Sequence, residues 1–138
     1  MIKQGIHMLS RIFLAFVTMA DAGAFWRVIE EHGVNTLFSA PTAFRAVRQA
    51  DPEGLMTKKY DLSSLRTVFA AGEQSDPSTL HWLEDILDVP ANVHWWQTKL
   101  AFPGAGNALG LGKITPRYGA CAAAVPGYDI RAFDDDGN

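Results

Sequence analysis

The chain has 138 residues, of which 48% are hydrophobic and 20% are charged, a composition typical of one folded domain and not of a disordered or fibrous protein. Its net charge of −3 argues against a nucleic-acid partner, because such proteins usually carry a basic surface. The single cysteine, Cys121, excludes an internal disulfide framework and a multi-cysteine zinc site. One free thiol suits a reducing compartment, so we expect a cytoplasmic location.

The N-terminal segment contains an apolar run, residues 12–20 (IFLAFVTMA), that follows basic residues at positions 3 and 11. The run is too short to span a bilayer, which needs about 20 residues, so we expect no membrane partner. Residues 20–22 (ADA) have the small side chains of a signal cleavage site, which leaves a secreted protein cleaved at about residue 22 as one interpretation. The alternatives are a buried strand or helix, or a start that does not belong to the domain.

The hydrophobic spacings of helices and strands alternate from Asp21 onward. Asp21 is suited to cap a first helix and Gly33 to end it. Prolines at positions 41 and 77 fit the first turns of two further helices. Helices separated by short apolar strands predict βαβ units, so the expected fold class is α/β with mostly parallel strands. The predicted helices cover residues 21–32, 41–50 and 76–88, and the predicted strands cover 35–39, 66–71 and 92–97.

The remaining segments are predicted to be connections and one terminal strand. Residues 51–64 are polar and indicate a surface connection, and residues 98–119 are rich in glycine and indicate a long irregular segment. Residues 128–133 alternate like a strand, and Asp135 to Gly137 is typical of a hairpin turn. We therefore expect the last strand to start a hairpin. Arg45 and Arg48 are interpreted as a solvated helix face.

Two predicted strands are followed by residues suited to binding a ligand. In an open parallel sheet, ligands bind beyond the carboxyl ends of the strands. One strand leads into a glycine and a carboxylate, at Gly72 and Glu73, and the other leads into two tryptophans, Trp95 and Trp96, with His94 beside them. Large flat rings next to a glycine backbone could stack a nucleobase or wall a small apolar pocket. The alternative is that both tryptophans fill a core.

Several segments in the same order resemble AMP-forming acyl-CoA synthetases, within the adenylate-forming superfamily. The resemblance is strongest to propionyl-CoA synthetases and next to acetyl-CoA synthetases, and it runs from Asp21 to Asn138. It implies that residues 21–138 are part of the large N-terminal domain of such an enzyme, with residues 1–20 outside the match. The segments are 21–28 (DAGAFWRV), 40–45 (APTAFR), 61–66 (DLSSLR), 71–73 (AGE), 95–98 (WWQT) and 125–128 (VPGY).

The resemblance implies a reaction, its cofactors and a set of site residues. Enzymes of this family join a short carboxylic acid to ATP as an acyl-adenylate and then pass the acyl group to coenzyme A. Trp96 matches the floor of the acyl pocket, and Ala71 matches a wall residue that is bulkier in acetate-specific relatives. The smaller side chain favours propionate by on the order of 1 kcal/mol. The residues that match the nucleotide-binding loops are Gly72, Glu73, Gln74, Trp95, Trp96, Gln97 and Thr98.

The chain also departs from the family pattern. The family follows the WWQT segment with a glutamate that carries Mg²⁺, and this chain has Lys99 there, which cannot supply the oxygen ligand that the ion needs. Val93 replaces an aspartate. The phosphate loop and the C-terminal catalytic lysine of the family match nothing here, so we expect no catalytic residue, no metal site and no activity from this chain alone. The missing parts also predict exposed apolar surface and self-association. The alternative function is a small non-catalytic module that binds a nucleotide or a partner.

Overall fold

The structure is a computed structural model that describes residues 12–14, 21–112 and 118–137. Its main sheet is parallel, with the strand order β1-β2-β3-β4. The strands are β1 (Ile12–Leu14), β2 (Thr36–Ser39), β3 (Thr67–Ala70) and β4 (Ala91–Val93). Helices connect them in βαβ units, namely α1 (Ala24–His32), α2 (Pro41–Ala50) and α3 (Pro77–Leu87). The predicted α/β class with mostly parallel strands is confirmed.

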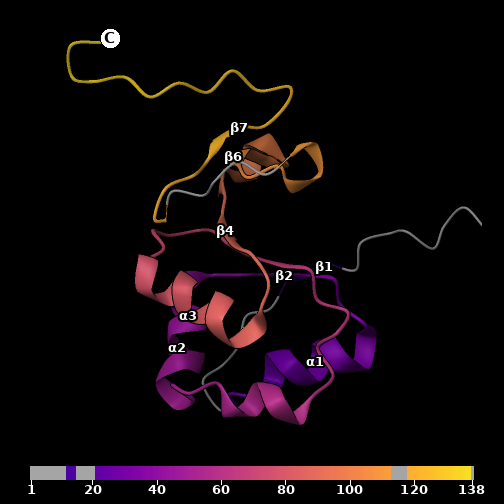
Figure 1. Ribbon diagram of the computed structural model, residues 1–138. Helices are drawn as coiled ribbons and strands as arrows, with labels where there is room; N and C mark the ends of the chain where they lie inside the picture. Colours follow the sequence, from indigo (N-terminus) through magenta and orange to yellow (C-terminus); the bar gives the residue numbers. More distant parts are fainter. Residues whose placement is uncertain (1–11, 15–20, 113–117, 138) are drawn as a thin grey trace, which may run out of the picture.

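A second, smaller sheet lies on the other side of the main sheet. Its strands are antiparallel and comprise β5 (Trp95–Trp96), β6 (Pro103–Gly106) and β7 (Ala123–Ala124). Figure 1 shows all three helices below the main sheet and strands β6 and β7 above it. The described part of the chain therefore has its helical layer on one face of the parallel sheet only.

The hydrophobic core lies between the helices and the lower face of the main sheet. Phe25, Phe44 and Leu37 are at most 1% exposed and come from α1, α2 and β2. Because side chains alternate along a strand, the neighbours of the core residues face the other way. Phe38 and Phe69 are such neighbours, and they point toward the second sheet, where they line a cavity described below. The apolar upper face of the sheet thus positions the candidate site.

Two of the three predicted capping residues lie at the observed ends of the helices. Gly33 ends α1 in the left-handed conformation with φ +58°, as predicted. Asp76 caps α3 by accepting a hydrogen bond of 2.8 Å from the backbone N–H of Thr79. The prediction for α1 was wrong at its start, since the helix begins at Ala24 with Gly23 as the N-cap. Asp21 instead accepts from the N–H of Gly23 and pairs with Arg27, which places it in the preceding turn.

The largest corrections fall in the second half of the chain. The strand predicted over 92–97 is two strands in different sheets, because the chain leaves the parallel sheet after β4 and turns into β5. The irregular segment 98–119 contains β6 and two short 3₁₀ helices, Thr98–Leu100 and Leu109–Leu111. Residues 128–133 form no strand, since no neighbouring strand in the described residues offers them a ladder, although the turn at 135–136 is present.

The polar connection and the N-terminal run each contain one short element. A 3₁₀ helix, Leu55–Lys59, lies within the predicted connection 51–64, and Gly54 before it has φ +63°. Strand β1 lies within the apolar run for which a secretory signal was one interpretation, and it pairs with β2. Residues 15–20 of that run lie outside the described residues. Among the described residues, no helix has both the length and the apolar character needed to cross a membrane.

Candidate functional site

The structure brings together the two segments that the sequence singled out. Ala71 to Gln74 follow β3, and His94 to Thr98 follow β4, which is the next strand of the parallel sheet. Ala70 and Val93 are paired in register, and the N–H of His94 donates to the carbonyl oxygen of Ala70 at 3.0 Å. Both segments therefore leave the sheet side by side at its carboxyl edge, where parallel sheets bind ligands.

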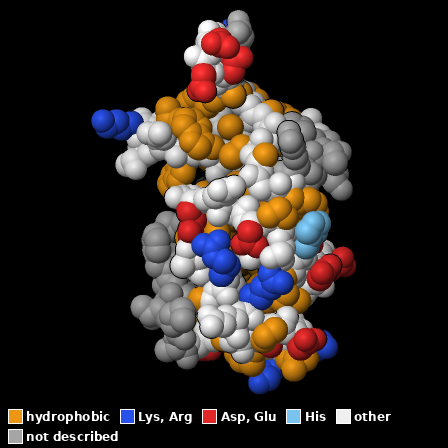
Figure 2. Space-filling model, turned by 90° about the vertical axis from the view of Figure 1, so that its left-hand side faces the viewer, with side chains coloured by type: hydrophobic (Ala, Val, Ile, Leu, Met, Phe, Trp, Pro, Cys, Tyr) orange, Lys and Arg blue, Asp and Glu red, His pale blue; other side chains and the backbone are white. Residues whose placement is uncertain are grey.

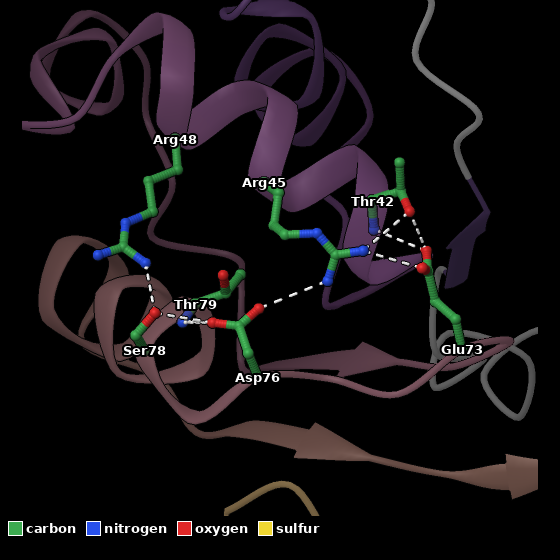
Figure 3. Close-up of polar contacts among 7 residues, drawn as sticks. All are labelled: Thr42, Arg45, Arg48, Glu73, Asp76, Ser78 and Thr79. Carbon is green, nitrogen blue, oxygen red and sulfur yellow. Dashed lines mark hydrogen bonds and ion pairs between the residues drawn. The ribbon is translucent and has the colours of Figure 1, made fainter.

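Glu73 points toward the N-terminus of α2 (Figure 3). Its Oε1 accepts a hydrogen bond of 2.8 Å from the backbone N–H of Thr42 and a second from the Thr42 hydroxyl. Its Oε2 lies 2.8 Å from Nη2 of Arg45. These bonds, first those from Thr42 and then those from Arg45, lower the pKa of Glu73 below the ordinary carboxyl value. The carboxylate is thus ionised, and both of its oxygens are bonded to residues of α2.

Arg45 was missed as part of the site, because on sequence alone it is one more charged residue on a helix face. Its guanidinium contacts Glu73 and, through Nη1 at 3.4 Å, Asp76. Hydrogen bonds from Ser78 first, then Thr79 and Arg45, oppose the effect of burial and hold the pKa of Asp76 far below its ordinary value. The signal that could have found Arg45 is its place in the 40–45 segment, which belongs to the resemblance.

Gly72 offers an open stretch of backbone directly before Glu73, whose carboxylate is bonded to α2. Its φ is +98°, a conformation that favours glycine, and a Cβ placed on it would meet no atom within 4 Å among the described residues. Gln74 beside it is exposed, whereas Ala71 is buried at 4% exposure. A ligand can therefore approach the peptide plane at Gly72 closely. Ala71, predicted to wall the acyl pocket, is not among the residues that line the cavity described next.

An apolar cavity of about 780 Å³ lies between the upper face of the main sheet and the second sheet. Trp96 lines it, and its ring lies 5.8 Å from that of Phe38. Trp95 does not line the cavity, and Trp95 and Trp96 are 42% and 40% exposed, so neither is a core residue. The other lining residues are Thr36, Thr67, Phe69, His94, Ala101, Phe102, Pro103, Gly106, Asn107, Ala108, Leu109, Gly110, Val125 and Pro126.

His94 is the one histidine of the described residues that lines this cavity. The centre of its ring lies 4.1 Å from that of Phe69 and 5.5 Å from that of Phe38. Its Nε2 is buried and has no hydrogen-bond partner among the described residues. Burial lowers the pKa of His94 to about 4, so the imidazole is neutral at physiological pH. The cavity therefore carries a neutral imidazole, whose Nε2 has no hydrogen-bond partner among the described residues, on a mostly apolar wall.

The burial of His94 predicts acid sensitivity. Because its folded-state pKa lies below the ordinary value of 6.5, the unfolded chain binds more protons between these values, and stability rises with pH across that window. We expect the free energy of unfolding at about pH 4.5 to be about 1–2 kcal/mol lower than at about pH 7, after a discount for partial exposure. Urea unfolding at each pH measures it. The lowered pKa of Glu73 acts in the same direction, but mainly below its ordinary value of 4.5, so it adds only a small part of the loss expected at about pH 4.5.

Two variants test whether His94 causes this pH dependence of stability. His94→Phe removes the titrating group and should flatten the dependence, while His32→Phe, at an exposed position at the end of α1, should leave it unchanged. A dependence that persists in His94→Phe would show that another group is responsible.

The residues around Lys99 do not fit a magnesium ion. Lys99 is exposed on the 3₁₀ turn Thr98–Leu100, together with Gln97 and Thr98 before it. Within residues 12–14, 21–112 and 118–137, no three His, Cys, Asp or Glu residues are placed to hold a metal ion. An ammonium repels a divalent cation and supplies no oxygen ligand. No chemical step is therefore derived through Mg²⁺.

Comparisons with known proteins agree on one family. The family described as AMP-binding enzyme matches residues 8–138. This range begins before residue 21, where the resemblance in the sequence begins, and it includes β1. The human protein named acyl-CoA synthetase short-chain family member 3, mitochondrial, is 46% identical over 117 residues, which are 84% of this chain and 17% of that protein. Propionate–CoA ligase of Escherichia coli is 32% identical over 124 residues, 90% of this chain and 19% of that protein.

A solved structure supports the same assignment. The crystal structure of an acyl-CoA synthetase from Brucella canis superposes with a TM-score of 0.70 at 33% identity, over 85% of this chain and 21% of that chain. The present chain thus spans less than a fifth of the length of the curated relatives named above.

Proposed function

This chain belongs to the AMP-binding enzyme family, and we propose that it forms the adenine and acyl side of the site of a short-chain acyl-CoA synthetase. The proposed overall reaction joins a short carboxylate to ATP as an acyl-adenylate with release of pyrophosphate, and then transfers the acyl group to coenzyme A with release of AMP. The observation that carries the proposal is the adjacency of the Gly72 and Trp95–Trp96 segments at the carboxyl ends of β3 and β4.

Each residue in these segments has a role that its position supports. The open peptide at Gly72 would lie against the base, while Glu73 and Gln74 belong to the same turn. Trp95 and Trp96 offer exposed rings for stacking and for the apolar wall, since large rings bury much area at little entropic cost. The exposed amide of Gln97 and hydroxyl of Thr98 are suited to hydrogen bonds with a phosphate.

Propionate is the proposed acyl substrate. Trp96 lines the apolar cavity, whose walls suit a hydrocarbon chain, and the limit to a short chain comes from the resemblance. Ala71 does not line this cavity, so its small side chain supports propionate over acetate through the resemblance alone. One of the matched relatives is named propionate–CoA ligase. We propose that this chain alone is inactive, because Lys99 stands where the family places its metal-binding carboxylate. That same substitution favours the second candidate, a module that binds a nucleotide without turning it over. A cytoplasmic location remains part of the proposal.

A tryptophan-fluorescence titration tests the binding proposal. The 138-residue chain is titrated with ATP and with an alkyl-AMP mimic of the adenylate. Of the four tryptophans, Trp26 and Trp82 are buried in the core, so a ligand at the candidate site should change mainly the emission of the other two. We expect saturable quenching that is lost in Trp96→Ala. The proposal fails if a folded chain shows no change up to millimolar ligand.

A pair of glycine variants separates site effects from backbone strain. Gly72→Val places a branched side chain where a ligand would approach and should abolish the quenching. Gly137→Val is the matched control, because Gly137 has φ +82° and equally open surroundings among the described residues, and it does not line the cavity. If both variants lose binding to the same degree, the loss reflects strain and not the site.

Self-association through exposed apolar side chains is also part of the proposal. Phe102, Leu111 and Phe133 are 60%, 75% and 66% exposed. Figure 2 shows hydrophobic side chains gathered in the upper part of the molecule, at the height of β6 and β7 in Figure 1. We expect the mass measured by light scattering to rise with protein concentration, and to rise less in Phe102→Ser than in Leu55→Ser on the helical side. A constant monomer mass would contradict this prediction.

A further inference from the structure

The N-terminus of α2 is capped by a residue from a distant loop. Ala40 precedes the helix and has no side chain that can cap it, and the first residue, Pro41, has no N–H. The N–H of Thr42 is one of the groups that a helix leaves without an internal partner. Glu73, 31 positions along the chain, accepts it at 2.8 Å. A carboxylate at this end of a helix is also favoured by the helix dipole.

Arg45 joins this cap to the cap of the next helix. Its Nη2 lies 2.8 Å from Glu73, and its Nη1 lies 3.4 Å from Asp76, the N-cap of α3 (Figure 3). Asp76 in turn accepts hydrogen bonds from the hydroxyl of Ser78 at 2.7 Å and from the N–H of Thr79 at 2.8 Å. One guanidinium therefore holds both ends of the segment 73–76, which directly follows Gly72.

From this geometry we propose that Glu73 and Arg45 are positioning residues, which hold the Gly72 backbone at the place where the nucleotide binds. The inference rests on the proposed function. Both oxygens of Glu73 are bonded to α2, so the carboxylate is oriented toward the helix and not toward the open side of Gly72. Gly72 itself has open space on its outer side, so the described residues there do not restrain it.

The exposure of the charged residues in this network indicates that they affect ligand binding more than the stability of the fold. Arg45 and Glu73 have side-chain exposures of 41% and 37%, and exposed ion pairs contribute little to global stability. A displaced backbone, in contrast, affects a binding site strongly, because small misplacements of a contact group reduce binding and catalysis sharply. Loss of the network should therefore reduce ligand affinity far more than it reduces the melting temperature.

The test measures the affinity of the chain for the alkyl-AMP mimic in four variants of the network and one control. Glu73→Gln and Arg45→Gln should each weaken binding about tenfold. The double variant should be no weaker than either single variant, because the two residues act through one contact. Arg45→Lys keeps the positive charge and should restore part of the affinity. Arg27→Gln is the matched control, since Arg27 on α1 forms a similarly exposed ion pair, at 2.7 Å with Asp21, and contacts neither Glu73 nor Asp76 through that pair.

Each outcome is decisive for the proposal. If Arg45→Gln binds like the wild type while Glu73→Gln does not, Glu73 contacts the ligand directly and the positioning role is wrong. Losses that multiply in the double variant would also overturn it. If the wild type binds no mimic, the proposed function fails. Amide hydrogen exchange then tests separately whether Glu73 and Arg45 hold the Gly72 backbone in place. Faster exchange at Thr42 and over residues 72–76 in Glu73→Gln then supports the positioning role, and unchanged exchange over 72–76 overturns it.

Discussion

Replacing Phe44 with alanine is expected to lower the free energy of unfolding by about 3–5 kcal/mol, the range found when a fully buried phenylalanine is truncated. Phe44 is 0% exposed and projects from α2 into the core. Its ring lies 5.8 Å from that of Phe25 on α1, so the truncation removes an aromatic contact as well as buried area. Urea unfolding followed by circular dichroism measures the loss.

A matched substitution on the surface controls this prediction. Phe102→Ala removes the same atoms from a ring that is 60% exposed, and it should change stability by no more than about 0.5 kcal/mol. A loss of less than about 1 kcal/mol in Phe44→Ala would mean that the helical layer is not packed as the structure has it. The consequence reaches the candidate site, because Thr42 and Arg45 lie on the same helix.

The helical half of the chain was predictable because local signals and tertiary packing agree there. Pro41 fixes the start of α2, and apolar residues at helical spacing face the core, so the predicted range 41–50 is the observed one. Asp76 likewise marks the start of α3. The second half lacked such signals. Strands β5 and β7 have only two residues each, too few for a period, and their existence depends on pairing with β6.

The candidate site was predictable in position and only partly in its interactions. Its two segments follow neighbouring strands, and the order of strands in a parallel sheet determines where they meet. The partner of Glu73 was not predictable, because Thr42 and Arg45 lie 31 and 28 positions away and look like ordinary helix residues in the sequence. Only the packing of α2 beside the loop after β3 brings them together. The charge of Lys99, in contrast, was fully visible in the sequence.

A buried amide joins the two sheets and carries the second large prediction. Asn92 on β4 is 2% exposed. Its Nδ2 donates to Oγ1 of Thr67 on β3 at 3.1 Å, and its Oδ1 accepts from Nδ2 of Asn107, just after β6, at 3.0 Å. Asn92→Ala removes both hydrogen bonds, each worth about 0.5–1.5 kcal/mol, together with packing around the amide. We expect a total loss of about 2–3 kcal/mol in the free energy of unfolding.

The same variant should change the candidate site, because Asn107 anchors the second sheet where β6 ends. Strand β6 pairs with the strand that carries Trp95 and Trp96, so loosening it should shift the native emission of those tryptophans toward that of solvated rings. Asn35→Ala is the matched control, since Asn35 donates to the carbonyl oxygen of Ser64 at 2.9 Å, and neither residue belongs to the second sheet. It should cost about 1 kcal/mol and leave the emission unchanged. Equal emission in both variants would mean that the tryptophan segment is held by β5–β6 pairing and not by the amide bridge.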